Sequence, residues 1–405
     1  MKTKECLKRA VAMVLALPLS LGLACGKSGL GNGPLVPTCD NCPAPPEFLY
    51  ATSPGAIVGF KIDQSTGALG SPLTMAGPSQ SLGMAAAITF GRLYVSDFVN
   101  NTLQGFSINS STGGLNAIPG SPFSLGGTPP GAGGVSPFVS SGSYLYVTNL
   151  NAGVVAGLTD ESPTGALNTV PGSPFPAGDT PVEAVVAGSQ NQFLYVSNLN
   201  DSAGGISAFT IDFNTGALTP MPGSPYATGA AGSFPGPSAL AISGNDQTLY
   251  VGLVGTTNAN NKIAAFAIDA NTGALTPIPG SPFTTGNAPQ YMAIVPVTFV
   301  AGTEFLYTAN VQDKTISGFI VDGNSGSLTP LSGSPYHGAT SLGDLAVTPT
   351  STSANFFLYA ADPQAKTVLA FTIDGTTGAL TPVSGSPFPA GKAPTLLTVA
   401  NVPVL

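Results

Sequence analysis

Charged residues, tryptophan and helical patterns are scarce in this sequence. Only 7% of its 405 residues are charged, and it contains no tryptophan. Beyond the N-terminus no long stretch places apolar residues at helical spacing, which excludes a helical bundle. Disorder is also excluded, because apolar residues make up 43% of the chain. Short apolar runs separated by many of the 52 glycines and 38 prolines predict strands joined by turns.

Common catalytic and metal-binding motifs are missing as well. The sequence has no G-x-S-x-G, no phosphate-binding P-loop and no histidine pair, since His337 is its single histidine. We expect His337 on the surface. The run Asn198-Leu199-Asn200-Asp201 offers oxygen atoms for Ca²⁺, but such a site needs about six to eight ligands. The sequence therefore predicts neither a bound metal nor a cofactor.

Residues 1–25 have the organisation of an export signal. Basic residues at the start precede an apolar run over 10–24, which ends in Leu-Gly-Leu-Ala before Cys25. This ending is similar to a bacterial lipobox, although Gly22 stands where leucine is usual. We expect a lipid on Cys25 that anchors the protein in the periplasm or at the cell surface. Ordinary signal cleavage nearby is the alternative.

A linker rich in glycine and proline follows over residues 26–47. It holds Cys39 and Cys42, whose C-x-x-C spacing allows a redox pair, half a zinc site or a disulfide. Two further zinc ligands are missing nearby, so a disulfide is the favoured interpretation. Without its signal the chain carries a net charge of −11. This charge argues against nucleic acid or anionic lipid headgroups as partners.

One pattern recurs from residue 48 onward, and three of its markers each occur seven times. The first is a strand-like LY pair, with Tyr50, Tyr94, Tyr146, Tyr195, Tyr250, Tyr307 and Tyr359. The second is a turn of the T-G-A-L type, with Gly67, Gly113, Gly165, Gly216, Gly273, Gly326 and Gly378. The third is G-S-P followed by an apolar residue. Seven copies within residues 48–405 give about 51 residues each, the size of a propeller blade.

The markers have structural explanations. A polar residue opens each turn, where its side chain can bond nearby backbone: Asp63, Asn109, Asp160, Asp212, Asp269, Asp322 and Asp374. We therefore predict that these residues build turns and are not a catalytic set. The proline of G-S-P cannot donate to a ladder and belongs at the end of an outer strand. The aromatic residue after it can pack between neighbouring blades.

A further strand precedes six of the seven LY pairs, as in residues 181–186, 237–242 and 289–294. The missing copy lies at the far end of the chain, in residues 394–399. The C-terminus should therefore supply the inner strand of the first blade and close the ring. The sequence predicts an all-β fold, a seven-bladed β-propeller of four-stranded blades, and a monomer.

The segments Tyr146-Val-Thr-Asn149 and Tyr195-Val-Ser-Asn198, with the D-x-x-T-G-A-L turns, resemble the lactonase-type seven-bladed propellers. That family includes bacterial propeller 6-phosphogluconolactonases, muconate cyclases and YVTN repeat proteins. The resemblance covers essentially all of 48–405. WD-repeat propellers are unlike this chain, which lacks tryptophan. The resemblance implies lactone hydrolysis as one function.

Function in a propeller is expected where its loops differ, since the scaffold itself is rigid. The rim with the repeated turns is uniform, whereas the opposite rim varies and is rich in small polar residues. That variable rim suits either solvation or weak binding of a polar small molecule, a glycan or an envelope protein. Its binding candidates are Asp97, Asn149, Asn198, Asp201, Asn310, Asp313 and Asp362.

The channel wall offers a second group of candidates. Equivalent inner-strand positions hold Ala85, Ser136, Glu183, Ala239, Tyr291, Asp344 and Leu396. In the resembling enzymes this place often carries histidine, close to arginine and glutamate, and here it carries neither histidine nor arginine. Glu183 and Asp344 belong to blades across the ring, and at ~10 Å their repulsion would be about 0.4 kcal/mol. We expect two solvated carboxylates rather than an acid/base pair.

Two classes of function remain open at this point. One is a non-catalytic binding or interaction scaffold of the cell envelope, and the other is a lactone hydrolase. Convergent polar groups at the channel mouth would favour the enzyme, whereas a lining of Ala, Leu and Ser would favour the scaffold. Arg92 is the single arginine after the signal and is expected on the uniform rim. Phosphorylated substrates prefer Arg or Lys donors, so efficient turnover of 6-phosphogluconolactone is not expected.

Overall fold

The computed structural model describes residues 45–87, 91–126, 131–135, 144–161, 165–188, 190–200, 205–228, 235–255, 261–295, 303–348 and 356–402. The export signal, Cys25, Cys39 and Cys42 lie outside the described residues, as do Ser136 and Asp201. The first strand begins at Glu47, one residue before the expected start of the propeller.

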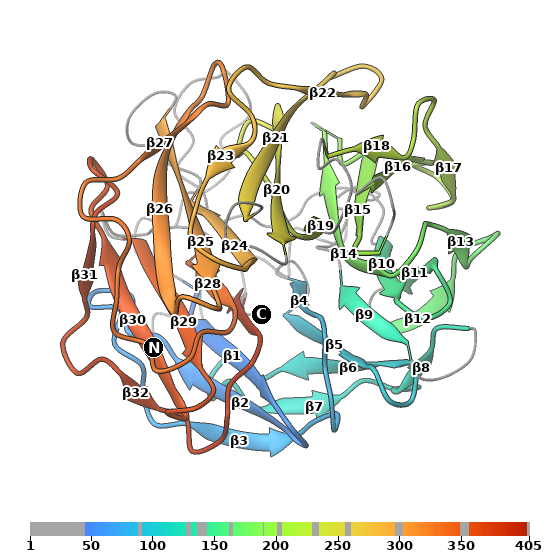
Figure 1. Cartoon of the computed structure of the whole chain (residues 1–405). Coiled ribbons are helices and arrows are strands. Elements are labelled where there is room, and N and C mark those ends of the chain that lie inside the picture. The colour runs from blue at the N-terminus through green and yellow to red at the C-terminus, as the bar shows by residue number, and fades with distance from the viewer. Residues whose placement is uncertain are drawn as a thin grey trace, which may run out of the picture. The chain divides into compact units, whose positions relative to one another are not determined.

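Seven antiparallel sheets form the blades, which are numbered here in the chain order of their second strands. The inner strands of blades one to seven are β33 (Leu397–Asn401), β4 (Met84–Ala87), β9 (Ala132–Val135), β14 (Pro181–Ala187), β19 (Pro235–Ile242), β24 (Pro289–Val295) and β28 (Leu345–Val347). The second strands are β1 (Glu47–Ser53), β5 (Arg92–Asp97), β10 (Tyr144–Asn149), β15 (Phe193–Asn198), β20 (Thr248–Gly255), β25 (Thr303–Asn310) and β29 (Phe356–Asp362). Figure 1 shows the sheets arranged in a ring, with the inner strands toward its centre.

The third strands are β2 (Ala56–Lys61), β6 (Thr102–Ile108), β11 (Val154–Glu161), β16 (Gly205–Ile211), β21 (Lys262–Ile268), β26 (Thr315–Asp322) and β30 (Thr367–Ile373). Along the outer edge lie β3 (Leu73–Ala76), β7 (Leu115–Ala117), β8 (Phe123–Ser124), β12 (Ala166–Thr169), β13 (Phe175–Pro176), β17 (Leu218–Pro220), β18 (Tyr226–Ala227), β22 (Leu275–Pro277), β23 (Phe283–Thr284), β27 (Leu328–Pro330), β31 (Leu380–Pro382) and β32 (Phe388–Pro389). In five blades two short outer strands pair with the same third strand.

The G-S-P segments therefore lie within the outer edge rather than only at its end. In blade two, for example, β7 and β8 both pair with β6, and the G-S-P residues 120–122 stand between them. The serine of this segment accepts a hydrogen bond from the Gly105 N–H at 3.0 Å. Proline is tolerated here because the chain leaves the ladder at this point.

The ring closes as the sequence predicts. Strand β33 pairs antiparallel with β1, with Leu49 opposite Val399 and Tyr50 opposite Thr398. The first blade thus combines its inner strand from the C-terminus with three strands from the start of the propeller. Closure leaves no open edge between blades one and seven.

The tyrosines of the LY pairs are fully buried and join neighbouring blades. Six of their hydroxyls donate to the carbonyl oxygen of the turn glycine in the next blade: Tyr50 to Gly113, Tyr146 to Gly216, Tyr195 to Gly273, Tyr250 to Gly326, Tyr307 to Gly378 and Tyr359 to Gly67. The donor–acceptor distances are 2.6–3.0 Å. Two markers that are 63–78 residues apart in sequence, or 292 apart where the ring closes, therefore act as one contact between blades.

The turn glycine is required for two reasons. Its φ is positive, for instance 74° at Gly67, a region that other residues rarely adopt. A Cβ at Gly67 would also lie only 2.2 Å from the Phe357 ring of the preceding blade. Tyr144, Phe193, Phe305 and Phe48 crowd the equivalent glycines in the same way.

Six of the seven polar turn residues have the predicted structural role. Asp269 is typical, since its carboxylate accepts the N–H groups of Asn271 and Thr272 at 3.0 and 2.8 Å. The same contacts recur at Asp63, Asn109, Asp212, Asp322 and Asp374.

The turn after Asp160 lies partly outside the described residues, and Asp160 itself has a further, charged partner. It is buried and forms an ion pair with Arg92 of the preceding blade. Arg92 occupies the place that an aromatic residue takes in most blades, against the turn glycine Gly165. The Tyr94 hydroxyl lies 3.4 Å from the Asp160 carboxylate. Arg92 is thus remote from the channel, as the sequence predicts, but has an unpredicted partner.

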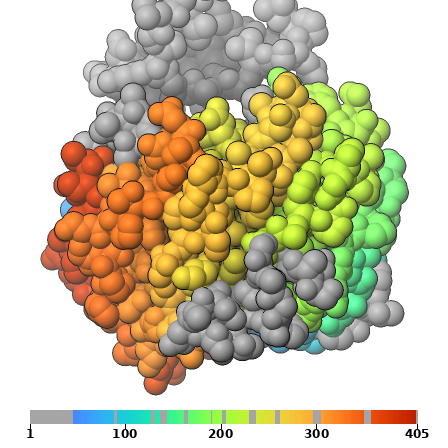
Figure 2. Space-filling model, turned by 45° about the horizontal axis from the view of Figure 1, so that its top comes forward, coloured from blue at the N-terminus to red at the C-terminus, as the bar shows by residue number. Residues whose placement is uncertain are grey.

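The core consists of apolar layers between adjacent blades. One cluster, for example, contains Val58 and Phe60 of blade one together with Phe357 and Val368 of blade seven. In Figure 2 the coloured surfaces of successive blades adjoin one another. Because both faces of each sheet are covered in this way, the second strands are buried at every position in most blades. Among the described residues there is no helix long and apolar enough to cross a bilayer.

Candidate functional site

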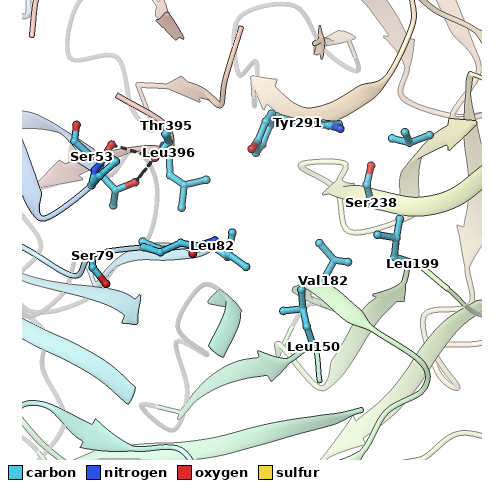
Figure 3. A pocket seen from close by; sticks show the side chains of 16 residues that line it. Ser53, Ser79, Leu82, Leu150, Val182, Leu199, Ser238, Tyr291, Thr395 and Leu396 are labelled. Atoms are coloured by element: carbon cyan, nitrogen blue, oxygen red, sulfur yellow. Dashed lines mark hydrogen bonds between the residues drawn. The ribbon is translucent and has the colours of Figure 1, made fainter. Parts of the chain in front are cut away.

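A cavity of about 500 Å³ opens at one end of the central channel. Its lining comes from the ends of second strands with the residues just after them, from segments that lead into inner strands, and from the first halves of inner strands. These segments belong to the variable rim, so the cavity lies where the sequence places functional variation. Figure 3 shows side chains from several blades directed toward it. The described lining residues are Thr52, Ser53, Pro54, Ser79, Gln80, Ser81, Leu82, Leu150, Val182, Leu199, Ser238, Val254, Gln290, Tyr291, Thr395 and Leu396.

None of these lining residues carries a charge. Hydroxyl and amide groups gather on the side of blades six, one and two, as Ser79, Gln80, Gln290 and Thr395 illustrate. Leu82 and Leu396 lie among them. The side formed by blades three to five is mainly aliphatic, with Leu150, Val182, Leu199 and Val254.

Glu183 and Asp344 occupy equivalent places in blades four and seven and make equivalent contacts. The Glu183 carboxylate accepts the Leu240 N–H at 2.9 Å, and the Asp344 carboxylate accepts the Leu397 N–H at 2.9 Å. Each donor belongs to the inner strand of the following blade. The two carboxylates therefore connect neighbouring inner strands around the channel.

The expectation that these carboxylates are well solvated is wrong. Burial raises the pKa of Glu183 to about 8 and that of Asp344 to about 7. Both side chains keep some accessible surface, but the protein around them withdraws their carboxylates from bulk water. Among the causes of the pKa shift at Glu183, the charge of Asp344 is the smallest. This agrees with the weak repulsion that is expected between carboxylates on opposite sides of the ring.

Tyr291 is the polar channel candidate, among the described residues, that lines the cavity. It lines the cavity from blade six, and burial followed by the charges of Asp344 and Glu183 raises its pKa. Its phenol is therefore a neutral donor at physiological pH. Ala85, Ala239 and Leu396 are buried apolar residues at the equivalent positions.

Most binding candidates of the variable rim are buried and have structural roles. The Asn198 amide donates to the Ser207 hydroxyl at 2.9 Å, and the Asn310 amide donates to Ser317 at 2.8 Å. Asp362 accepts the Thr340 and Ser341 N–H groups. Asp97 and Asn149 likewise accept N–H groups of their own hairpins.

These five side chains end their second strands and turn inward, so the expectation of a binding rim does not hold for them.

Asp313 is exposed and accepts both N–H groups of Asn287, from its backbone at 2.7 Å and its side chain at 2.8 Å. Because the Asn198 side chain is buried, it also cannot serve as a ligand for Ca²⁺ in the segment 198–201. Among the described residues, no three His, Cys, Asp or Glu side chains group together as metal ligands would.

Tyr291 and Leu396 are channel positions that the sequence predicts, whereas the serines and glutamines that also line the cavity were not identified from the sequence. Ser79 and Gln80 lie in the segment that leads into β4, and Gln290 is the second residue of β24, so a position near the start of an inner strand is the signal that could have indicated them. Their convergence depends on the ring, because blades one, two and six are distant in sequence. His337 is exposed, as the sequence predicts.

A sequence profile described as "Lactonase, 7-bladed beta-propeller" matches residues 138–342, half of the chain. No curated protein matches the chain in sequence. A structure from Bacteroides fragilis, provisionally described as a 6-phosphogluconolactonase, is 16% identical with a TM-score of 0.66. It covers 88% of this chain and 98% of its own.

A similar protein from Bacteroides uniformis has 17% identity and a TM-score of 0.65, and covers 88% of this chain and 99% of its own. The periplasmic gluconolactonase of Pseudomonas aeruginosa has 18% identity and a TM-score of 0.63, with the same coverage. These structures share the fold, and the profile match identifies the family. The chain is a member of the lactonase family of seven-bladed β-propellers.

Proposed function

We propose that this protein is an envelope propeller that binds a small uncharged molecule at the mouth of its central channel. The observation that carries the proposal is the cavity of about 500 Å³ whose described lining has no charged side chain. Its volume is within the ~300–1,000 Å³ of typical ligand sites. Neutral hydroxyl, amide and phenol groups can orient a ligand there without the cost of burying a charge.

A phosphorylated sugar lactone fits this site poorly. Arg92 is held by Asp160 far from the channel, and Lys262 bonds the Thr284 hydroxyl on the outer part of its blade. The charges of Asp344 and Glu183 act on Tyr291, and these carboxylates repel a phosphate bound near it when they are ionised. We therefore expect negligible hydrolysis of 6-phosphogluconolactone above its spontaneous rate.

The test compares glucono-δ-lactone with 6-phosphogluconolactone on the purified propeller. Calorimetric titration should detect the uncharged lactone and not the phosphorylated one, and Gln290→Ala with Tyr291→Phe should weaken the binding. The exposed Phe213→Ser variant, on the uniform rim, is the control and should bind normally. Tighter binding of the phosphorylated compound would contradict the proposal. So would an affinity for glucono-δ-lactone that is unchanged in the Gln290→Ala and Tyr291→Phe variants.

Lactone hydrolysis is the second candidate function, and the raised pKa values of Glu183 and Asp344 favour it. An ionised carboxylate near Tyr291 could take a proton from water as it attacks the lactone carbonyl. The ring C–O bond then breaks, and the protonated carboxyl group returns its proton to the leaving oxygen, which gives a hydroxy acid and restores the carboxylate. Such turnover should rise with pH between about 6 and 8 and vanish in Glu183→Gln and Asp344→Asn variants that still bind. Turnover unaffected by both substitutions would exclude this role.

The cellular location is a separate part of the proposal. A lipid on Cys25 would hold the propeller at the membrane through the linker. Cys25→Ser should therefore move the protein from the membrane to the soluble fraction, whereas the matched Cys39→Ser variant should stay on the membrane. An unchanged distribution of Cys25→Ser would remove the lipid anchor from the proposal.

A further inference from the structure

We propose that the ligand of the channel mouth is amphipathic, with an uncharged polar ring and an aliphatic chain. This inference rests on the proposed function and specifies its ligand. The cavity has two unlike sides, so a ligand that is polar all round or apolar all round would match only half of the lining.

The aliphatic side is formed by Leu150, Val182, Leu199 and Val254 of blades three to five. All four are partly exposed, so their apolar surface faces the cavity instead of the core. Ser238 interrupts this side, but its hydroxyl lies 3.3 Å from the Gly252 carbonyl and is engaged there. A hydroxylated ligand placed against this side would lose its water partners without gaining new ones.

The polar side offers hydrogen-bonding groups that remain available. Ser79, Gln80 and Gln290 are exposed at the cavity, and among the described residues their side chains have no hydrogen-bond partner. Tyr291 adds a neutral phenol from the same sector. Figure 3 places Ser79 and Thr395 on the opposite side of the cavity from Leu199 and Val182. A carbonyl or hydroxyl head group can thus be bound here while a chain lies on the aliphatic side.

Three compounds with one six-membered lactone ring test the inference: glucono-δ-lactone, δ-valerolactone and δ-decalactone. The last adds a pentyl chain to the second. Each buried methylene changes the dissociation constant roughly fourfold. Partial burial of the chain should therefore make δ-decalactone bind at least tenfold more tightly than δ-valerolactone. Saturation-transfer NMR should show contacts from both the chain and the ring.

The double variant Val182→Thr with Val254→Thr keeps side-chain shape and makes the aliphatic side polar. It should remove most of the advantage of δ-decalactone while glucono-δ-lactone binds as before. The control is Leu73→Ser, an exposed leucine on the outer strand of blade one, which should leave all three affinities unchanged.

Equal affinities for δ-valerolactone and δ-decalactone, with glucono-δ-lactone bound, would overturn the amphipathic ligand and leave the proposed function intact. Binding of none of the three compounds would overturn both. A chain advantage that persists in the threonine double variant would also contradict the inference, because it would place the chain elsewhere.

Discussion

At the scale of single residues, Arg92 shows how one blade departs from the common contact. Five blades place an aromatic residue against the next turn glycine, whereas blade two places Arg92 there and pairs it with Asp160. Both charged side chains are nearly inaccessible, at 7% and 0% exposed. A buried pair adds little net stability, but loss of one partner leaves an uncompensated charge.

We therefore predict that Arg92→Ala lowers the free energy of unfolding by about 3–5 kcal/mol. The double variant Arg92→Phe with Asp160→Asn should recover much of this loss, since blades one and two contain Phe48 and Asn109 at the same places. Urea denaturation measures both effects. If the double variant were less stable than Arg92→Ala, an aromatic residue against the turn glycine could not replace the ion pair at this place.

The inter-blade tyrosines allow a second prediction at this scale. Tyr250→Phe removes the hydroxyl that donates to the buried Gly326 carbonyl at 2.8 Å. The loss should be about 1–2 kcal/mol, because the carbonyl keeps no partner in its place. Tyr226→Phe is the matched control, since its exposed hydroxyl bonds the nearby Pro222 carbonyl and its loss should have little effect. Similar losses for both variants would contradict the inter-blade explanation.

At the scale of elements, β33 is the strand on which closure depends. Leu396, Leu397 and Val399 are at least nine-tenths buried, and burial of three such side chains contributes roughly 5–9 kcal/mol. That amount is comparable with the ~5–15 kcal/mol of net stability of a whole domain. Deletion of residues 393–405 should therefore unfold or aggregate the protein.

Removal of residues 403–405 alone provides the control, because it leaves β33 complete. This shorter chain should melt near the temperature of the full-length protein in a calorimetric scan. If the long deletion also melted near that temperature, the closure strand would be dispensable for stability.

The seven blades and the closing strand could be predicted because their markers repeat in sequence. The tyrosine, the turn glycine and G-S-P each have a local cause, and the inner strand missing before Tyr50 indicated residues 394–399. The site was less predictable for a physical reason. Glu183 and Asp344 lose solvent because neighbouring blades bury them, and Asn198 turns inward because Ser207 offers a partner. Both effects depend on distances between elements, which the pattern along one chain does not contain.

At the scale of the whole molecule, buried carboxylates make stability depend on pH. Burial raises the pKa of Glu47 and of Asp344 to about 7, and that of Glu183 to about 8. Each group binds its proton more tightly in the folded state than in the unfolded state. Their contribution to stability is therefore complete below the unfolded values near 4 and is lost as the pH rises through about 7–8.

The turn aspartates act in the opposite direction. Hydrogen bonds from Thr272 lower the pKa of Asp269, and similar bonds lower that of Asp374. Their contribution is present above the unfolded value near 4 and is lost as the pH falls below it. The two groups of carboxylates together place maximum stability near pH 4–5.

We predict that the melting temperature rises when the pH is lowered from 8 to 5 and falls again below about 4. Glu47→Gln should raise the melting temperature at pH 8 and flatten the profile. Asp179→Asn removes an exposed charge and serves as the control for net charge, with an unchanged slope. A melting temperature that is constant or higher at pH 8 than at pH 5 would contradict this linkage.

The bonds from each tyrosine to the next turn also define a direction around the ring. At six of the seven junctions a hydroxyl of one blade donates to a carbonyl of the next, and Tyr359 to Gly67 joins the last blade to the first. In terms of assembly these are heterologous, head-to-tail interfaces, which form closed rings or, when closure fails, open filaments. A chain that has lost its closing strand would expose the donor side of blade seven, with Tyr359, and the acceptor side of blade one, with Gly67. Its ends are complementary to those of other copies, so damage at the C-terminus favours end-to-end polymers.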